Sequence, residues 1–303
     1  MKLLKFLVAG LVLISSAGAV WSQNKVTAVA VGSRIDISIN DNLFTQYIFR
    51  EDEKYPYFFP VNGPSGFGMT SMRNGLYPHH SSLFFACDRV NGGNYWQEGL
   101  ERGQIRPLRA EIKKSGADSV VIVNECIWSR PGAESPIRDV RTITVTAPAK
   151  NLYIIDFDIR MDMLMDVVIE KTNHSLFSVR MAHDLSVANG GRMVNANGGS
   201  GEQGDSGTFG KPSPWMDGYG TRNGKTEGLA IFQHPSNLWY PSPWFTRDYG
   251  FFSPTPMYFV KDEASGTRFK KGESLRLRYR VLVHSGDPVE ADVEGQFKQY
   301  RKK

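Results

Sequence analysis

Two adjacent histidines, His79 and His80, follow a loop punctuated by glycine and proline and precede the apolar run Leu83-Phe84-Phe85. A loop that ends where a strand begins places polar side chains at the rim of a sheet, a common setting for a binding or catalytic site. Histidine exchanges protons near neutral pH, so an acid–base or metal-ligand role is possible for either residue. Adjacent side chains of an extended chain point to opposite faces, so at most one ring easily faces inward. Two surface or hydrogen-bonded histidines are the alternative.

A second segment that also combines histidine, proline and aromatic residues runs from Phe232 to Gly250 and includes His234, Trp239 and Trp244. Its three prolines favour an extended loop, and exposed aromatic clusters mark interaction sites. Aromatic faces stacked on a sugar ring, with arginine, asparagine and histidine holding hydroxyls, are typical of a carbohydrate site. The alternative is that both tryptophans pack in the core beneath a long loop. We expect this segment and the His79-His80 loop to line one cleft.

A small set of residues could carry the chemistry of such a cleft. Residues 189–224 are rich in Gly, Asn and Ser, and this stretch is either disordered or a functional loop, the reading favoured here. A guanidinium binds a carboxylate through two parallel hydrogen bonds, which suits arginine for holding a uronate or substrate hydroxyls. We expect acid–base or metal-ligand roles for His79, His80 and His234 and an acid–base role for Glu202. The expected substrate-binding residues are Arg180, Arg247, Asn237, Tyr249, Trp96, Trp215, Trp239 and Trp244.

Two further carboxylates, Asp88 and Glu98, follow the first histidine segment and could line the same cleft. His183 lies near Arg180, and a structural histidine is the favoured interpretation there. No local ligand spacing demands a metal, although histidines from separate segments could close on a divalent ion. No cofactor is required by the sequence.

The elements that must position these residues are strands. Polar and apolar residues alternate over 34–39, 152–161 and 274–284, and residues 119–123 and 229–232 are typical of more deeply buried strands. A single helix is predicted near the C-terminus, where Asp287 can act as the cap and Pro288 suits the first turn. Many alternating strands without interleaved helices predict an all-β protein, an antiparallel β-sandwich. We expect one domain over residues 20–303.

The first residues have the pattern of a secretory signal peptide over residues 1–19. Lys2 and Lys5 precede a short apolar core, and Ala17-Gly18-Ala19 offers small residues for cleavage. We therefore expect a periplasmic or secreted, soluble protein without a membrane anchor. Removing both lysines from the 36 basic residues leaves 34 against 31 acidic residues, a net charge of +3 that is too mild to imply nucleic acid. The cysteines, Cys87 and Cys126, form either a disulfide or two buried thiols.

The same motifs resemble a known family. They are Pro56-Tyr57-Phe58-Phe59-Pro60, Pro78-His79-His80-Ser81-Ser82-Leu83-Phe84-Phe85, Tyr95-Trp96, Pro235-Ser236-Asn237 and Pro243-Trp244-Phe245-Thr246-Arg247-Asp248-Tyr249-Gly250. Together they resemble the PmoA-like family of exported bacterial proteins, often labelled "methane oxygenase PmoA", over most of residues 40–285. The resemblance implies a soluble β-sandwich often found with carbohydrate catabolism. Family members commonly carry an acidic residue before Pro-His-His, whereas this chain has Leu76-Tyr77, which argues against a carboxylate–histidine dyad at that point.

Two functions are compatible with these features. The first is an exported carbohydrate-active enzyme, a glycoside hydrolase or lyase, on a supersandwich resembling galactose mutarotase. The second is a non-catalytic glycan-binding protein that uses the same aromatic residues. An enzyme should gather several histidines and carboxylates in one cleft, whereas a binding module should show aromatic residues alone. Because His, Arg and Asp accompany the aromatics, the enzyme acting on a saccharide is favoured.

Overall fold

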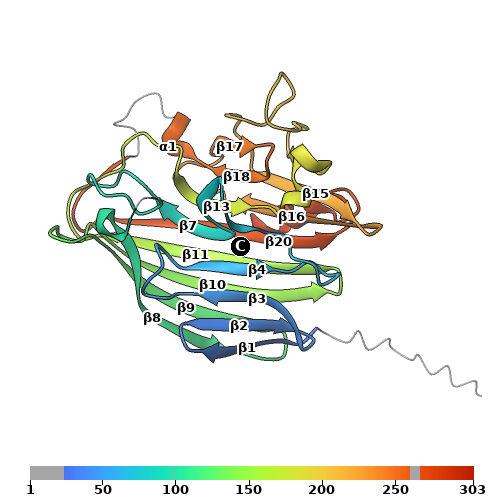
Figure 1. The fold of residues 1–303 in the computed structure, drawn as a ribbon, viewed down its shortest axis with the longest axis horizontal. Helices are drawn as coiled ribbons and strands as arrows, with labels where there is room; N and C mark the ends of the chain where they lie inside the picture. Colours follow the sequence, from blue (N-terminus) through green and yellow to red (C-terminus); the bar gives the residue numbers. More distant parts are fainter. Residues whose placement is uncertain (1–23, 98, 260–266) are drawn as a thin grey trace, which may run out of the picture.

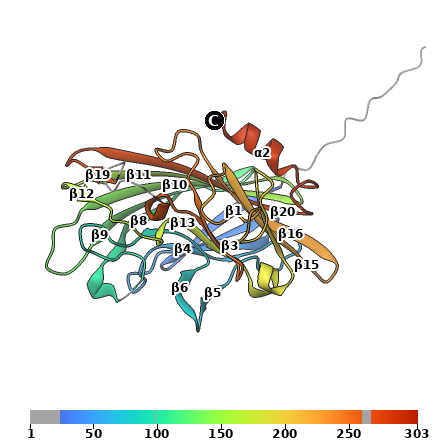
Figure 2. The same cartoon turned by 90° about the horizontal axis from the view of Figure 1, so that it is seen from above.

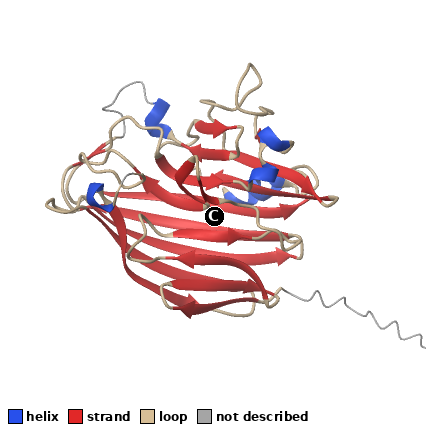
Figure 3. Ribbon diagram, viewed as in Figure 1, coloured by secondary structure: helices blue, strands red, loops and turns tan. Residues whose placement is uncertain are grey.

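Two large antiparallel sheets stack on each other in the computed structural model, which describes residues 24–97, 99–259 and 267–303 (Figures 1 and 3). Each sheet has eight strands. Sheet I has the order β1 (Val26–Val31), β2 (Arg34–Ile39), β3 (Asn42–Ile48), β4 (Tyr57–Val61), β7 (Leu83–Cys87), β13 (Ser175–Arg180), β18 (Phe251–Pro254) and β17 (Trp244–Arg247). Sheet II has the order β14 (Arg192–Asn195), β15 (Trp215–Arg222), β16 (Lys225–Gln233), β20 (Ser274–Ser285), β11 (Leu152–Met163), β10 (Ile137–Ala149), β9 (Ser119–Ser129) and β8 (Gln104–Lys114).

The remaining elements are short. Two further sheets have two strands each: β5 (Met72–Asn74) with β6 (Tyr77–Ser81), and β12 (Val167–Val168) with β19 (Arg268–Phe269). In the described residues the α-helices are α1 (Pro256–Phe259) and α2 (Val293–Tyr300). Short 3₁₀ turns are formed by Leu100–Arg102, His183–Leu185 and Val187–Asn189. Residues 189–224, which were expected to lack strands, include all of β14 and β15, because long-range pairing overrides the loop-like composition there.

The main core lies between the two sheets. The alternating face predicted for residues 152–161 is buried as expected, with Ile155, Phe157, Ile159 and Met161 all in the core. Phe177 of β13 in sheet I packs against Phe157 with ring centres 4.7 Å apart, so side chains of the two inner faces interdigitate. The thiols of Cys87 and Cys126 are both buried and unpaired rather than joined in a disulfide.

Helix α2 covers part of the outer face of sheet II. Its Val293, Phe297 and Tyr300 pack in a second apolar cluster with Phe232 and Leu282. The predicted cap is one turn too early. Asp287 accepts from the backbone of Val289 and Glu290 in a separate turn, and that turn ends at Asp292, whose φ is +49°. Asp292 is the actual cap and accepts from the Gly295 amide. Within the described residues, no helix has the length and apolarity needed to cross a membrane.

Candidate active site

The outer face of sheet I, away from sheet II, carries a row of functional side chains. Alternation along β13 turns Phe177 and Val179 toward the core and therefore turns Arg180 to the outer face. Arg180 pairs across the sheet with Phe251 of β18, which in turn pairs with Arg247 of β17. The β5–β6 hairpin projects on this side of the sandwich, whereas α2 lies on the opposite side (Figure 2). The row and the hairpin together frame the candidate site.

The hairpin brings an aromatic stack onto this face. The rings of Tyr77 and Tyr249 stack with centres 4.3 Å apart, and Tyr77 also stacks on His80 at 5.1 Å. On its other side His80 lies over Phe251 at 4.5 Å. His80 is only 4% exposed. Burial, followed by the charges of its neighbours His79 and Arg180, lowers the pKa of His80 to about 2, so this ring is neutral at physiological pH.

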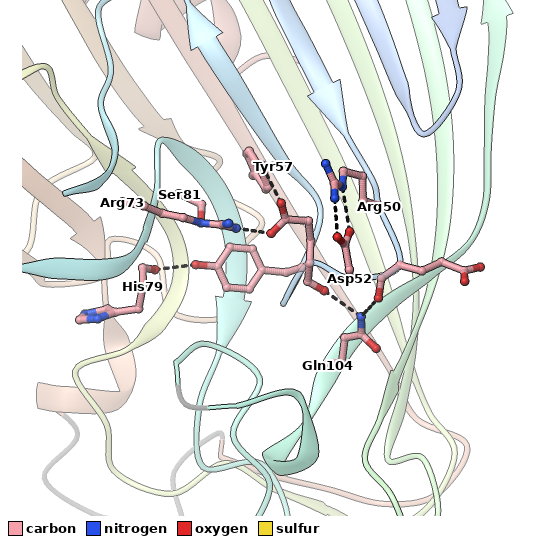
Figure 4. Close-up of polar contacts among 10 residues, drawn as sticks. Arg50, Asp52, Tyr57, Arg73, His79, Ser81 and Gln104 are labelled. Carbon is pink, nitrogen blue, oxygen red and sulfur yellow. Dashed lines mark hydrogen bonds and ion pairs between the residues drawn. The ribbon is translucent and has the colours of Figure 1, made fainter. Parts of the chain in front are cut away.

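His79 points to a different environment. Its ring lies edge-to-face against His80 at 4.5 Å and against His174 at 5.6 Å. The Tyr55 hydroxyl donates to its backbone carbonyl at 2.7 Å, which fixes the chain at this point (Figure 4). The ring is half-buried, and burial followed by the proximity of His174 lowers the pKa of His79. His79 is therefore a mainly neutral imidazole that can accept a proton.

A carboxylate–imidazole pair stands beside it. Asp88 follows β7 and His174 precedes β13, and the Asp88 amide donates to the His174 carbonyl at 3.0 Å, so pairing of the two strands sets the two side chains together. His174 Nδ1 lies 3.1 Å from Asp88 Oδ2. When Nδ1 carries the proton it donates to the carboxylate, and Nε2 is then the free acid–base position. Trp96 packs on the His174 ring at 5.4 Å.

Two adjoining cavities meet at these histidines. The larger, of about 680 Å³, is lined in part by His79, Ser81, Trp96 and Gln97. The smaller, of about 380 Å³, is lined in part by Asp88, Gln97, His174 and Tyr258. Gln97 lines both cavities, and the His79 ring of the larger cavity contacts the His174 ring of the smaller one, so the two cavities adjoin at these imidazoles.

The carboxylates of the larger cavity are engaged by arginines. Arg50 Nε donates to Asp52 at 2.8 Å, and Arg73 forms an ion pair with Glu53 (Figure 4). Asp88 is the other carboxylate close to the histidines, and one of its oxygens, Oδ1, has no partner. Asp88 is therefore the carboxylate best placed to act with a histidine.

Several buried polar atoms in this region have no hydrogen-bond partner in the described part of the chain. They are His80 Nδ1, Asp88 Oδ1, Trp96 Nε1, and Nε and Nη1 of Arg180. Buried polar atoms are normally paired, because an unpaired one costs about 1–3 kcal/mol. Donors and acceptors left unpaired together on one face indicate a site that a polar ligand or water fills.

Of the second segment, Tyr249 meets the His79-His80 segment by stacking on Tyr77, whereas the expectation that His234 lines the same cleft is wrong. His234 Nδ1 lies 2.8 Å from Ser236 Oγ and 2.7 Å from Arg278 Nη2, and its ring packs on Tyr300 of α2. The chain between β16 and β17 passes from sheet II to sheet I, so the two ends of the segment face opposite sides of the sandwich. Asn237 stays with sheet II, where its amide bonds both backbone groups of Arg278.

Of the four tryptophans expected to stack on a sugar, only Trp96 joins the histidine cluster. Trp244 is 0% exposed and donates to the Ser213 carbonyl at 2.8 Å. Trp215 packs beneath α2 and donates to Glu294 at 2.9 Å. Trp239 is half-buried against Phe269. The core-packing alternative is correct for Trp244, since large apolar rings gain most by full burial.

Glu202 holds a loop rather than facing the histidines. Its carboxylate accepts from Arg247 Nη1 at 2.6 Å and from the Asp248 amide at 3.0 Å, and its own amide donates to Asp248 Oδ1 at 2.9 Å. Arg247 also packs on the Phe245 ring. These contacts tether the glycine-rich loop to the β17–β18 hairpin. The side chain of His183 is exposed and belongs to a 3₁₀ turn, and Glu98 lies outside the described residues.

Sequence reasoning missed His174 and Tyr77. His174 follows a short polar stretch and precedes the buried strand β13, which is the same setting that drew attention to His79. The signal was therefore present for His174. Tyr77 was treated as a departure from a family pattern, whereas its ring contacts His80, Arg180 and Tyr249. In the described ranges, no group of three or more His, Cys, Asp or Glu residues could hold a metal ion.

Comparison with solved structures finds distant neighbours of the same architecture. Galactose 1-epimerase from Lactobacillus acidophilus NCFM matches with a TM-score of 0.43 and 9% identity, over 87% of this chain and 99% of that one. A putative aldose 1-epimerase from Escherichia coli K12 matches with 0.39 and 12%, over 86% and 99%. A GalM/aldose epimerase homologue from C. elegans matches with 0.36 and 9%, over 87% and 100%.

The antiparallel β-sandwich with a C-terminal helix that the sequence predicts is confirmed by the two large sheets and by α2. No curated protein sequence matches the chain. One family profile matches residues 34–298, most of the chain. The protein therefore belongs to the family of unknown function DUF6807.

Proposed function

We propose that this protein is an exported carbohydrate-active enzyme that cleaves a glycosidic bond, as a hydrolase or a lyase, where the His79 and His174 cavities meet. The observation that carries the proposal is the set of unpaired buried polar atoms beside two contacting imidazoles. A saccharide supplies what these atoms lack, because each hydroxyl both donates and accepts hydrogen bonds. Trp96 is only 1% exposed and supports the His174 ring, whereas the half-buried Tyr77 stacks on His80 and Tyr249.

The proposed chemistry is acid–base catalysis by two histidines. Hydrolysis and elimination both need one group to accept a proton and another to protonate the departing oxygen. Asp88 orients His174 through Nδ1 and leaves Nε2 for proton transfer, so we assign the role of acid to His174. His79, whose pKa is lowered by burial and by His174, is suited to be the base. His80 is too strongly held in its neutral form to release a proton, so its role is to pack and orient.

A second candidate function is glycan binding without catalysis. The observation that favours it is that Asp52 and Glu53, the carboxylates of the larger cavity, are both held by arginines. Two free carboxylates are the usual requirement of a glycosidase. Export is part of the proposal because it is inferred from residues 1–19, which lie outside the described residues. Membership of the PmoA-like family is also proposed, because the resemblance rests on sequence motifs alone.

Turnover of purified polysaccharides and oligosaccharides by His174→Ala and Asp88→Asn tests the enzyme proposal. Each variant should lose roughly a hundredfold or more in turnover, the scale of a lost acid–base group. Far-ultraviolet circular dichroism should stay unchanged. His183→Ala is the matched control, since that histidine is exposed and outside the cluster, and it should keep full activity. Full activity of both site variants would refute the acid–base assignment. Glycan binding without turnover by the wild type would favour the binding protein.

A further inference from the structure

Three arginines are almost fully buried: Arg141, Arg180 and Arg280, each 2–3% exposed. Two of them hold a carboxylate with two nitrogens. Arg141 donates to Asp139 from Nε at 2.8 Å and from Nη2 at 3.1 Å. Arg280 donates to Asp156 from Nε at 2.6 Å and from Nη2 at 2.7 Å. In this protein a buried guanidinium therefore normally comes with its own counter-charge, as the cost of desolvating an ion requires.

Arg180 is the exception. It forms no ion pair with any described residue, and its Nε and Nη1 have no hydrogen-bond partner. Its contacts are the rings of Tyr249 and Tyr77, which lie 4.3 Å and 5.0 Å from the guanidinium carbon. Burial lowers the pKa of Arg180, and the two phenols offset this only in part. A cation is thus held in a desolvated position without an anion.

The surroundings leave this charge uncompensated. The nearby imidazole of His80 is neutral, and burial raises the pKa of Tyr249 to about 12, so this phenol carries no negative charge. Glu202, which contacts the neighbouring strand β17, is engaged by Arg247. A guanidinium can bind a carboxylate through the Nε/Nη2 edge or the Nη1/Nη2 edge, and each edge of Arg180 has an unpaired nitrogen.

We propose that Arg180 binds a carboxylate of the substrate, so that the saccharide taken by this site contains a uronic acid. The inference rests on the proposed function only in taking the ligand to be a saccharide. The substrate carboxylate would be the counter-ion of Arg180, as Asp139 is for Arg141 and Asp156 is for Arg280. Tyr77, one of the two tyrosines over Arg180, belongs to the β5–β6 hairpin, whose strands pair only with each other, so Tyr77 can shift without breaking either large sheet.

Calorimetric titration with monosaccharides tests the proposal independently of catalysis, because these ligands have no glycosidic bond. D-glucuronate or D-galacturonate should bind the wild type at least about tenfold more tightly than D-glucose or D-galactose, the scale of hydrogen bonds to a charged group. Arg180→Gln should abolish this preference, and Arg180→Lys should restore it only in part, because an ammonium lacks the planar fork. Arg192→Gln removes an exposed charge of sheet II as the matched control and should leave the preference intact.

Thermal unfolding of the ligand-free protein provides a second, independent test. Arg180→Met should keep or raise the Tm, because it removes an unpaired buried charge. Arg141→Met should lower the Tm, because it leaves Asp139 buried without a partner. A lowered Tm for Arg180→Met similar to that of Arg141→Met would mean that the protein itself satisfies Arg180, and would overturn the proposal.

The outcomes separate this inference from the proposed function. Equal binding of uronates and neutral sugars, or a uronate preference that survives Arg180→Gln, overturns the role of Arg180 even if a neutral glycan is cleaved. Binding of glucose 6-sulfate without binding of glucuronate overturns the choice of carboxylate. Uronate binding that depends on Arg180, with no glycan cleaved, supports the anion site and refutes the enzyme.

Discussion

The ring of His79 lies edge-to-face against that of His174, with 5.6 Å between the ring centres. One ring belongs to the projecting hairpin and the other precedes a central strand of sheet I. A positive charge on either ring opposes a charge on the other, which is one reason that the pKa of His79 is lowered. Together with burial, the contact therefore favours the neutral form of His79, which its proposed role as base requires.

The pH dependence of turnover should reflect this arrangement. Because burial and His174 lower the pKa of His79 below 6.5, the base is already unprotonated at neutral pH. We expect kcat/KM to fall on the acidic side, below pH 6.5, where His79 becomes protonated. The acidic limb should disappear in His79→Gln, which retains a low residual rate. If the acidic limb of the pH profile is unchanged in His79→Gln, the base is another residue.

His80 should make the fold sensitive to acid. Its pKa is about 2 in the folded protein against 6.5 for an ordinary histidine, so between these values the unfolded chain binds one more proton. Stability from this group is complete above pH 6.5 and is lost as the pH falls, by about 1.4 kcal/mol per pH unit. Urea unfolding of wild type and His80→Phe at pH 7 and pH 5 measures the difference. The variant should lose less stability over this interval.

The buried Asp217–His284 pair should act in the opposite direction. His284 Nε2 lies 3.0 Å from Asp217 Oδ2, and neither side chain is exposed. Burial opposes the imidazolium charge, but the Asp217 carboxylate outweighs it, so the pKa of His284 is raised. The stabilisation is complete below pH 6.5 and is lost as the pH rises through the folded-state pKa. His284→Asn should leave Asp217 unpaired and cost about 3–5 kcal/mol in unfolding free energy at pH 6. The cost should shrink toward alkaline pH.

Trp244→Ala should damage the fold rather than weaken sugar binding. Trp244 is 0% exposed, packs near Phe252 and donates its indole hydrogen to Ser213. Replacing a buried tryptophan by alanine leaves a cavity and costs about 3–5 kcal/mol. Chemical denaturation should show this loss, and glycan affinity measured where the variant is folded should equal that of the wild type. Trp96 is 1% exposed and its ring packs on His174, so Trp96→Ala should lower both the stability and the glycan affinity.

Glu202→Gln tests whether Glu202 holds the glycine-rich loop in place or acts as an acid–base group. The substitution keeps the size of the side chain but removes the charge that Arg247 and the Asp248 amide contact. We expect faster amide hydrogen exchange in residues 199–210, a loss of about 1–3 kcal/mol typical of a charged hydrogen bond, and turnover within a few-fold of wild type. A loss of turnover comparable to that of His174→Ala, without faster exchange, would return Glu202 to the catalytic residues.

The sequence by itself determined the strands and part of the site. The polar–apolar alternation of residues 152–161 and 274–284 is a local property with a period of two, so it predicts strands and their buried faces before any contact is known. The same local reasoning drew attention to His79 and His80, which were expected in a loop before a strand and lie within the short strand β6, and to Tyr249 in a segment rich in aromatic residues. It placed the C-terminal helix correctly but its cap one turn too early, because helix ends depend on the backbone turn that precedes them.

Only the tertiary structure decided which of these residues meet. His174 joins His79 because β7 pairs with β13 and brings Asp88 and His174 to one end of the strand pair. His234 leaves the site because the chain crosses from sheet II to sheet I between β16 and β17. Local patterns show which residues share a face of one strand, but not which sheet or which side of the sandwich that face belongs to. Pairing between segments far apart in sequence makes that choice, and it alone left Arg180 buried without an anion.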